Sequence, residues 1–333
     1  MSFVNNAHCV VADPVLWMFS ESRRHPMQIT RRTALAAGLS TAAAIPASRA
    51  LGETGSTNRR RVLRVAHLTD AHVLPGKGAG DGLAMCLEHA QDKGADFIIF
   101  GGDNVMNVDG DGRETAAAQL DVFKGSVKHA CSKPHHCVIG NHDILRLDPV
   151  DGKKWATDAF GLDNRYGEFA VPGSGSWQFI ALDSTSPEGG GYKGRFDDEQ
   201  LDWLERTLRD VPEDQHVCIV SHIPILAACV YFDGENEKSG NWRVPGAWMH
   251  IDARRLKDLF LKHPQVKLCL SGHIHLVDVV DYLGVRYACN GAVSGGWWRG
   301  DYHEFAPGYA LVDLFDDGSS EIEFFNYGWV TRE

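Results

Sequence analysis

Pairs of side chains that bind metal ions lie close together at two points in this 333-residue sequence. Asp70 and His72 are two positions apart, and so are His273 and His275. Side chains two positions apart in an extended chain lie on the same side, so each pair could hold one ion. An Asx turn beside a bystander histidine is the alternative explanation for the first pair. The two histidines form the stronger metal pattern.

Polar residues of the same kinds follow other apolar runs. Asp103 comes after two glycines, which allow close backbone approach, and is placed to bridge two metal ions. Asn141 offers a neutral oxygen ligand and His142 an imidazole. His222 stands alone, where a histidine is more often structural, yet it continues the series. Asp143 either orients His142 or caps a following helix, and both readings stay open.

Each of these clusters lies where a buried strand is expected to end. Short apolar or alternating runs predict strands, and apolar residues at helical spacing predict helices between them. Alternation of the two kinds predicts an α/β fold with its chemistry at the carboxyl ends of the strands. The predicted strands are 61–68, 96–100, one ending at Val138-Ile139, 177–182, 217–220 and 266–270, and the predicted helices are 80–93, 114–130, 196–208 and 251–261.

The last third of the sequence has two segments without a clear period. Residues 229–250 predict a lid or a substrate-specificity insertion, with a solvated surface loop as the alternative. Trp297, Trp298 and Arg299 could line a pocket and contact substrate, as could Asp143, or the 297–299 residues could pack the sheet edge. The remaining predicted strands are 276–282, 285–289, 309–314 and 321–325, with a hairpin turn at Asp317-Gly318.

Composition limits the class of protein. The formal net charge of −11 argues against a nucleic-acid polymer as partner, although a metal centre could still attract a small phosphate ester. Eight cysteines form no CxxC pair. Several lie in apolar runs as small core residues, while Cys131 and Cys137 could pair in an oxidising compartment.

The first fifty residues predict export. Arg31-Arg32, an Ala-rich apolar stretch and a small-residue end at Ala50 are typical of a twin-arginine signal; an amphipathic surface helix is the alternative. We expect residues 1–26 to be an upstream extension, 27–50 the signal peptide, 51–60 a linker and 61–333 a single domain. The protein would meet the export machinery, have no stable membrane span and be periplasmic or extracellular.

The ordered set of motifs strongly resembles the calcineurin-like metallophosphoesterase superfamily over about residues 62–309. The resemblance implies a four-layer α/β/β/α sandwich with a two-metal site. Met106 replaces the tyrosine ligand of purple acid phosphatases, and the pattern is most similar to the group containing bacterial cyclic-nucleotide phosphodiesterases. The motifs that carry it are Asp70-x-His72, Gly102-Asp103, Gly140-Asn141-His142-Asp143, His222 and Gly272-His273-x-His275.

Residue by residue, the resemblance implies two ligand sets that share Asp103. One metal would be held by Asp70, His72, Asp103 and His275, and the other by Asp103, Asn141, His222 and His273. The mixed oxygen and nitrogen donors suit iron, manganese or zinc rather than calcium. His142 would be catalytic, contacting the phosphate or protonating the leaving oxygen.

The implied activity is phosphate-ester hydrolysis by a metal-bound hydroxide. A phosphodiesterase is the first expectation, and a phosphomonoesterase on the same centre is the alternative. A non-catalytic metal-binding scaffold is the third reading, although no ligand position is vacant. Because an exported enzyme would not meet intracellular cyclic nucleotides, another phosphodiester or a nutrient phosphate ester stays open as substrate.

Overall fold

The computed structural model describes residues 59–109, 113–145 and 151–331. The predicted upstream extension, the predicted signal peptide and most of the predicted linker lie outside these residues. The elements, in chain order, are β1 (Arg61–Leu68), α1 (Ala79–Asp92), β2 (Phe97–Phe100), α2 (Arg113–Ala130), β3 (His135–Cys137), α3 (Asp151–Phe160), β4 (Gly167–Phe169), β5 (Trp177–Leu182), β6 (Thr185–Glu188), β7 (Gly191–Gly194), α4 (Asp198–Asp210), β8 (His216–Ser221), the 3-10 turn η1 (Cys229–Tyr231), α5 (Ala253–Lys262), β9 (Val266–Ser271), β10 (Asp278–Tyr282), β11 (Val285–Cys289), β12 (Gly308–Phe315) and β13 (Ser320–Asn326).

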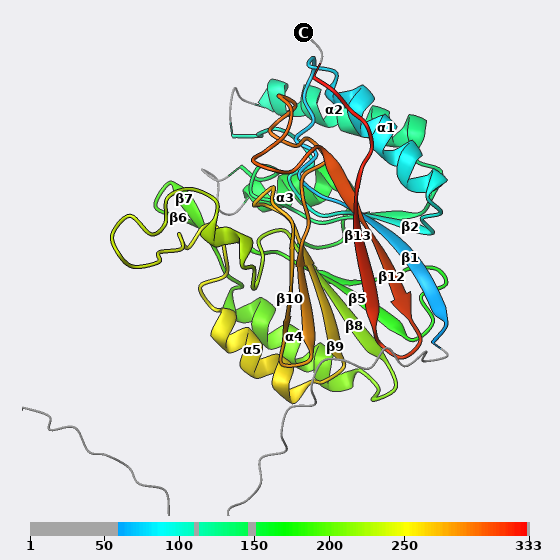
Figure 1. The fold of residues 1–333 in the computed structure, drawn as a ribbon, viewed down its shortest axis with the longest axis vertical. Helices are drawn as coiled ribbons and strands as arrows, with labels where there is room; N and C mark the ends of the chain where they lie inside the picture. The colour runs from blue at the N-terminus through cyan, green and yellow to red at the C-terminus, as the bar shows by residue number, and fades with distance from the viewer. Residues whose placement is uncertain (1–58, 110–112, 146–150, 332–333) are drawn as a thin grey trace, which may run out of the picture. The chain divides into compact units, whose positions relative to one another are not determined.

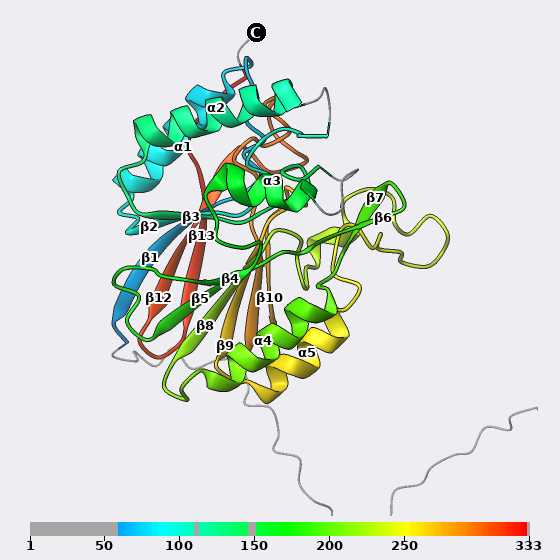
Figure 2. The ribbon, with the colours of Figure 1, turned by 180° about the vertical axis from the view of Figure 1, so that it is seen from behind.

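Two sheets face each other, and helices cover their outer faces (Figures 1 and 2). The five-stranded sheet has the order β13-β12-β1-β2-β3, and the six-stranded sheet has the order β10-β11-β9-β8-β5-β4. The neighbours β1, β2 and β3 run parallel, as do β5, β8, β9 and β11. The four-layer α/β/β/α sandwich is therefore confirmed.

Strand periodicity explains the layers, because successive side chains point to opposite faces of a sheet. In β8, Val217 and Ile219 pack with the cluster that contains the leucines of α4 and α5. Cys218 and Val220 point the other way, into the cluster shared by the two sheets. Both faces of β8 are buried, and its sequence is accordingly a continuous apolar run.

Helix α4 shows how local sequence fixes an element. Asp197 precedes it, and its carboxylate accepts a hydrogen bond from the backbone N–H of Gln200 at 2.9 Å. Leu201, Leu204 and Leu208 then follow at helical spacing and are buried against the second sheet. The helix begins two residues later than the predicted 196, because Asp197 is its cap.

Most predicted elements are present, and the differences lie in the middle of the chain. The third strand ends at Cys137, although Val138 still donates a backbone hydrogen bond to Phe100, and Val138 and Ile139 are buried. α3, β4 and the β6–β7 hairpin were not predicted, because their short polar sequences carry no clear period. Among the described residues, no helix is long and apolar enough to cross a membrane.

Candidate metal centre

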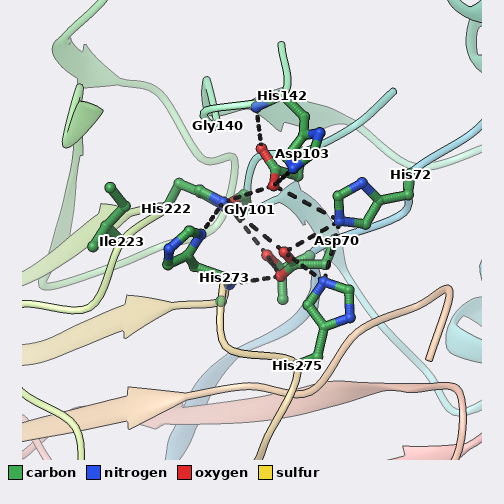
Figure 3. A network of polar contacts seen from close by, with 12 residues as sticks. Asp70, His72, Gly101, Asp103, Gly140, His142, His222, Ile223, His273 and His275 are labelled. Carbon is green, nitrogen blue, oxygen red and sulfur yellow. Dashed lines mark hydrogen bonds and ion pairs between the residues drawn. The ribbon is translucent and has the colours of Figure 1, made fainter. Parts of the chain in front are cut away.

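The predicted ligands come from loops at one edge of each sheet. Asp70 and His72 follow β1, Asp103 follows β2, and Asn141 follows β3, so the carboxyl ends of three parallel strands deliver them. His222 follows β8, and the 273–275 histidines follow β9 in the facing sheet. The carboxyl ends of parallel strands meet at one edge, and here the two edges converge (Figure 3).

The ligand loops have an unusual backbone. Of the ten non-glycine residues with positive φ in the described chain, five are candidate ligands. Positive φ is uncommon outside glycine and is retained where surrounding structure enforces it, often at functional sites. Backbone bonds enforce it here, because the N–H groups of Asp70 and His72 bond to the carbonyls of Gly102 and Asp103. The five residues are Asp70, His72, Asp103, His273 and His275.

One group of donor atoms consists of Asp70, His72 and His275. The Nε2 atoms of the two histidines are 3.1 Å apart. Asp70 Oδ1 lies 3.3 Å from Nε2 of His275 and 3.8 Å from Nε2 of His72. All three side chains are at most 2% exposed. Two nitrogens and one carboxylate oxygen thus face one small volume, which agrees with the predicted first ligand set.

A second group consists of Asp103, His222 and His273. Nε2 of His222 lies 3.1 Å from Asp103 Oδ2 and 3.3 Å from Nδ1 of His273. Asp103 Oδ2 is also 3.7 Å from Nε2 of His72, so this carboxylate stands between the two groups, as a bridging ligand must. Figure 3 shows the rings and carboxylates directed toward a common centre.

Backbone carbonyls fix the ring orientations. Nδ1 of His222 contacts the carbonyl of Gly101 at 3.0 Å, and Nδ1 of His275 contacts the carbonyl of Gly295 at 2.7 Å. His273 uses its other nitrogen, because Nε2 contacts the carbonyl of Ala247 at 2.9 Å while Nδ1 faces the site. A proton held toward the carbonyl leaves the inward nitrogen free to bind a metal ion.

Burial and charge set the protonation of the ligands. Burial lowers the pKa of His72 to about 3 and that of His273 to about 4, which favours neutral rings. Burial raises the pKa of Asp70 and Asp103, but nearby histidines, His222 first, outweigh it and lower both. Burial also lowers the pKa of His222, but Asp103 and Asp70 outweigh this effect and raise it to about 9.

One further observation indicates that this set of donor atoms is suited to metal ions. Asp70 Oδ1 and Asn141 Oδ1 are buried and have no hydrogen-bond partner. A buried oxygen without a partner is costly, and both atoms belong to predicted ligands, so a cation would satisfy them. Oxygen and imidazole donors without thiolate suit iron, manganese or zinc.

Two glycines are required for the loops to meet. A Cβ at Gly140 would lie 2.1 Å from Asp103 Oδ1, and one at Gly272 would lie 2.3 Å from Asp70 Oδ2. Any larger residue would collide with a ligand carboxylate. The glycines therefore belong to the motifs because the backbone of one loop passes directly over the ligands of another.

The side chains of His142 and Asp143 lie in different environments, one partly exposed and the other buried. The backbone N–H of His142 donates a hydrogen bond to Asp103 Oδ1. The His142 side chain is 32% exposed, and its Nε2 lies 4.0 Å from Asp103 Oδ2. It is the accessible imidazole at the rim of the centre. Asp143 is fully buried and neither orients His142 nor caps a helix, because it accepts N–H bonds from Gly140, Asn104 and Val105.

In place of the three roles predicted from the sequence (orienting His142, capping a helix and contacting substrate), the structure gives Asp143 a structural role. Three of its hydrogen bonds, from Asn104 and Val105, join the loop after β2 to the loop after β3, and the fourth, from Gly140, lies within the second loop. Burial and the neighbouring Asp103 raise the pKa of Asp143 to about 7, while its backbone N–H donors act in the opposite direction. The α3 helix begins at Asp151, too far along the chain for Asp143 to be its cap.

The three candidate substrate contacts after β11 lie in different environments. The Trp297 ring centroid is 4.5 Å from that of His275, and the side chain is partly exposed. Trp298 is buried against Trp329 and donates through Nε1 to the carbonyl of His72 at 3.0 Å, so it packs the core and is not open to substrate. Arg299 is exposed.

Several supporting residues were not found from the sequence. Thr69 Oγ1 donates to Asp70 Oδ2 at 2.7 Å, and Ser294 Oγ donates to the carbonyl of Asp70 at 2.8 Å. Beneath them His67, whose pKa burial lowers to about 4, contacts Asn290 Nδ2 at 2.7 Å. Serine, threonine and histidine have many structural uses in strands and loops. No spacing in the sequence distinguishes Thr69, Ser294 and His67 from other residues of the same types.

The cysteine pair suggested by the sequence is not bonded. Cys131 and Cys137 are free cysteines. Burial raises the pKa of the Cys137 thiol, which disfavours the thiolate needed for disulfide exchange.

The match to a family model decides the family. The calcineurin-like phosphoesterase model matches residues 63–277, which span every candidate ligand. The chain belongs to the calcineurin-like phosphoesterase family. That match agrees with the resemblance found in the motifs and with the geometry of the centre.

Two curated relatives and one solved structure are similar to this phosphoesterase. An Escherichia coli protein named 3′,5′-cyclic adenosine monophosphate phosphodiesterase is 28% identical over 44% of this chain and 50% of its own length. A Nostoc protein named 3′,5′-cyclic-nucleotide phosphodiesterase is 24% identical over 79% of this chain and 91% of its own. A dimetal phosphatase from Danio rerio has a TM-score of 0.55 at 16% identity, covers 81% of this chain and all of that one, and shows a shared fold. The chain thus spans about half the length of the first relative.

Proposed function

We propose that this phosphoesterase is a metal-dependent phosphodiesterase with a two-cation centre. One cation would be held by Asp70, His72 and His275, and the other by Asn141, His222 and His273, with Asp103 shared. Two cations bound at such a centre neutralise phosphoryl oxygens and lower the pKa of water toward the neutral range.

The position of Asp103 carries the proposal. Its Oδ2 atom lies within 4 Å of Nε2 of His72, His142 and His222, and Asp103 belongs both to a donor group with His72 and to one with His222. A carboxylate shared between two histidine groups is the arrangement that two cations need and a single-cation site does not. The buried oxygens of Asp70 and Asn141 that have no hydrogen-bond partner support the same conclusion.

The chain's own residues have separable tasks in such a reaction. The anchored rings of His222, His273 and His275 keep their inward nitrogens directed at the centre. His142 is the exposed imidazole nearest the shared carboxylate, so it can contact a phosphate oxygen or give a proton to the leaving oxygen. Trp297, beside His275, is placed at the same rim.

Preference for diesters is supported by the names of the two curated relatives. The test is to compare a bis-aryl phosphate with a mono-aryl phosphate on protein supplied with manganese. We expect higher kcat/KM for the diester. Equal or higher turnover of the monoester would assign a phosphomonoesterase to the same centre instead.

A scaffold without catalysis is distinguished by metal content and turnover together. We expect purified protein to hold close to two cations at the centre, and chelation to abolish hydrolysis. Much less than one cation per chain, with no hydrolysis of either ester after reloading, would favour the scaffold. Iron, manganese and zinc should be reloaded separately, since the donor set accepts all three.

Export by the twin-arginine route is part of the proposal and is supported by Arg31-Arg32 and the apolar stretch after them. Folded cargo could carry its metals with it. The substrate would then be a phosphodiester outside the cytoplasm. Replacing both arginines by lysine should retain the protein in the cytoplasm, and fractionation that still finds it in the periplasm would contradict this route.

A further inference from the structure

A second group of metal-binding atoms lies outside the centre described above. Asp278 is the first residue of β10 and pairs with Cys289, the last residue of β11. Directly paired residues in antiparallel strands have side chains on the same face. Cys229 begins η1, and its Sγ, the Cys289 Sγ and a carboxylate oxygen of Asp278 all lie within 4.8 Å of one another. We call these three residues the thiol cluster.

The Asp278 carboxylate is only half satisfied. Its Oδ2 accepts hydrogen bonds from the backbone N–H groups of Ala228 at 2.6 Å and Cys229 at 2.8 Å. Its Oδ1 is buried and has no hydrogen-bond partner. Among the described residues, no cationic side chain forms an ion pair with Asp278. A partly buried carboxylate without a positive partner is unfavourable, and burial raises the pKa of Asp278 although hydrogen bonds from Ala228, Cys229 and Cys289 act in the opposite direction.

The two thiols complete the site. Cys289 is fully buried and Cys229 is 6% exposed, so neither is a surface thiol. Cys289 Sγ faces inward, 3.3 Å from the carbonyl of Gly272. Within the described part of the chain, these are the only cysteines that share a three-donor group with a carboxylate.

We infer that the thiol cluster binds one thiophilic divalent cation, of which zinc is the best match. Two soft thiolates and one hard carboxylate oxygen form a mixed donor set that suits the borderline cation zinc rather than magnesium or calcium. Zinc bonds of about 2.0–2.3 Å require donors somewhat closer than 4.8 Å, which small side-chain rotations supply. Binding releases the two thiol protons to solvent, and the cation supplies the positive charge that Asp278 lacks.

A disulfide between Cys229 and Cys289 is the competing outcome for the same atoms. It would consume both thiols, yet it would leave Asp278 Oδ1 without a partner and its charge uncompensated. The carboxylate therefore favours the cation. The two outcomes differ in mass, in free-thiol count and in metal content, so one sample distinguishes them.

A cation in the thiol cluster would join three parts of the chain near the metal centre. Cys229 opens the 229–250 segment, whose Ala247 carbonyl holds His273. Cys289 contacts Gly272, the residue before His273. The cation would thus tie the beginning of the segment to the strands that support the histidine loop.

Cobalt substitution separates the two sites, because the metal centre contains no thiolate. The full chain, reduced and freed of metal, is titrated with Co²⁺ and followed by absorption. We expect a thiolate-to-cobalt charge-transfer band in the near ultraviolet, one cation beyond those of the metal centre, and protection of two thiols from a maleimide. Zinc should displace the cobalt and remove the band.

Variants locate the band. Cys229→Ser and Cys289→Ser should each weaken or remove it. Asp278→Asn should keep it but lower cobalt affinity by at least about tenfold, because even outer-shell changes cost about that much and here a direct ligand loses its charge. Cys218→Ala, which removes a buried thiol outside the cluster, should leave it unchanged.

The wild-type result is decisive even if a cysteine variant fails to fold. No charge-transfer band in folded, fully reduced protein would overturn the inference. A Cys229–Cys289 disulfide in protein purified without reductant, with no thiolate-bound metal beyond the cations of the metal centre after reduction and reloading, would overturn it too. Failure of phosphodiester hydrolysis would leave it standing, because the spectrum does not depend on turnover.

Discussion

The metal centre and the thiol cluster are built in different ways. Five ligands of the metal centre have positive φ and belong to loops that leave the strands, whereas no residue of the thiol cluster has positive φ and two of them lie in paired strands. The centre uses nitrogen and oxygen donors, and the cluster mainly sulfur. Strained loops at parallel strand ends are suited to several converging ligands, while regular strands can present only the residues that face each other.

The first way to break this comparison is to remove the shared carboxylate. Asp103→Ala should abolish hydrolysis, with a loss well beyond the roughly 10–100-fold typical of outer-shell changes, because both cations lose a ligand. The thiolate-to-cobalt band of the thiol cluster should persist. Kinetics, metal analysis and the cobalt spectrum test this on one preparation, with circular dichroism to establish folding.

The matched control replaces an exposed carboxylate, Asp158→Ala, which should keep full activity. Loss of the cobalt band together with activity in Asp103→Ala would mean that the two groups do not bind independently.

The second prediction concerns the rim. His142→Ala should lower kcat by about 10²–10⁴-fold, because the accessible imidazole is lost. Cation content should stay unchanged, since His142 is not one of the seven proposed metal ligands. Steady-state kinetics and metal analysis check both. Unaltered kcat would contradict the role given to His142, and lost cations would make it a ligand.

The third prediction tests how far the core supports a ligand. Trp298→Phe removes the donor to the His72 carbonyl while keeping an aromatic ring, and should lower metal affinity by about tenfold, at the lower end of outer-shell effects. Trp329→Phe is the control, because Trp329 packs on Trp298 and its Nε1 has no hydrogen-bond partner. Equal affinities in the two variants would show that the hydrogen bond does not matter.

The smallest effect concerns a buried histidine outside both groups. His136 stacks on Phe169 with ring centroids 4.0 Å apart, and burial lowers its pKa to about 4. Above pH 6.5 the ring is neutral in both states. Between pH 6.5 and 4 only the unfolded chain takes up the proton, so stability falls by up to roughly 3 kcal/mol and then levels off.

His136→Phe keeps the stack and removes this proton. Urea unfolding at several pH values should therefore show the variant gaining on the wild type as pH falls from 6.5 to 4. His136→Gln removes the proton and the stack, so it should show the same relative pH trend from a lower starting stability. Parallel curves for all three proteins would contradict the assignment.

The sequence predicts the metal centre far better than the thiol cluster, and the reason is physical. His273 and His275 are neighbours because one loop must deliver both, so their spacing is visible in the sequence. Cys229, Asp278 and Cys289 meet only through strand pairing and a 3-10 turn, so no local pattern marks them. Most strands and helices were predicted because they bury one face or two.

The roles that could not be predicted depend on the direction in which a loop side chain points. Trp297 and Trp298 are adjacent and of one type, yet one lies beside His275 and the other enters the core. Their left-handed backbone, with φ of 54° and 65°, separates them, and no residue pattern encodes that for two tryptophans. The role of Asp143 was missed for a similar reason, since three of its four hydrogen bonds come from another loop.

The four hydrogen bonds of Asp143 have a consequence for the width of the centre. Three of them brace the loop that carries Asp103 against the loop that carries Asn141, and the fourth, from Gly140, holds the second loop together. The hydrogen bonds therefore fix the distance between the two ligand loops before any cation binds. The spacing of the candidate ligands on these two loops is thus held by a side chain that belongs to neither donor group.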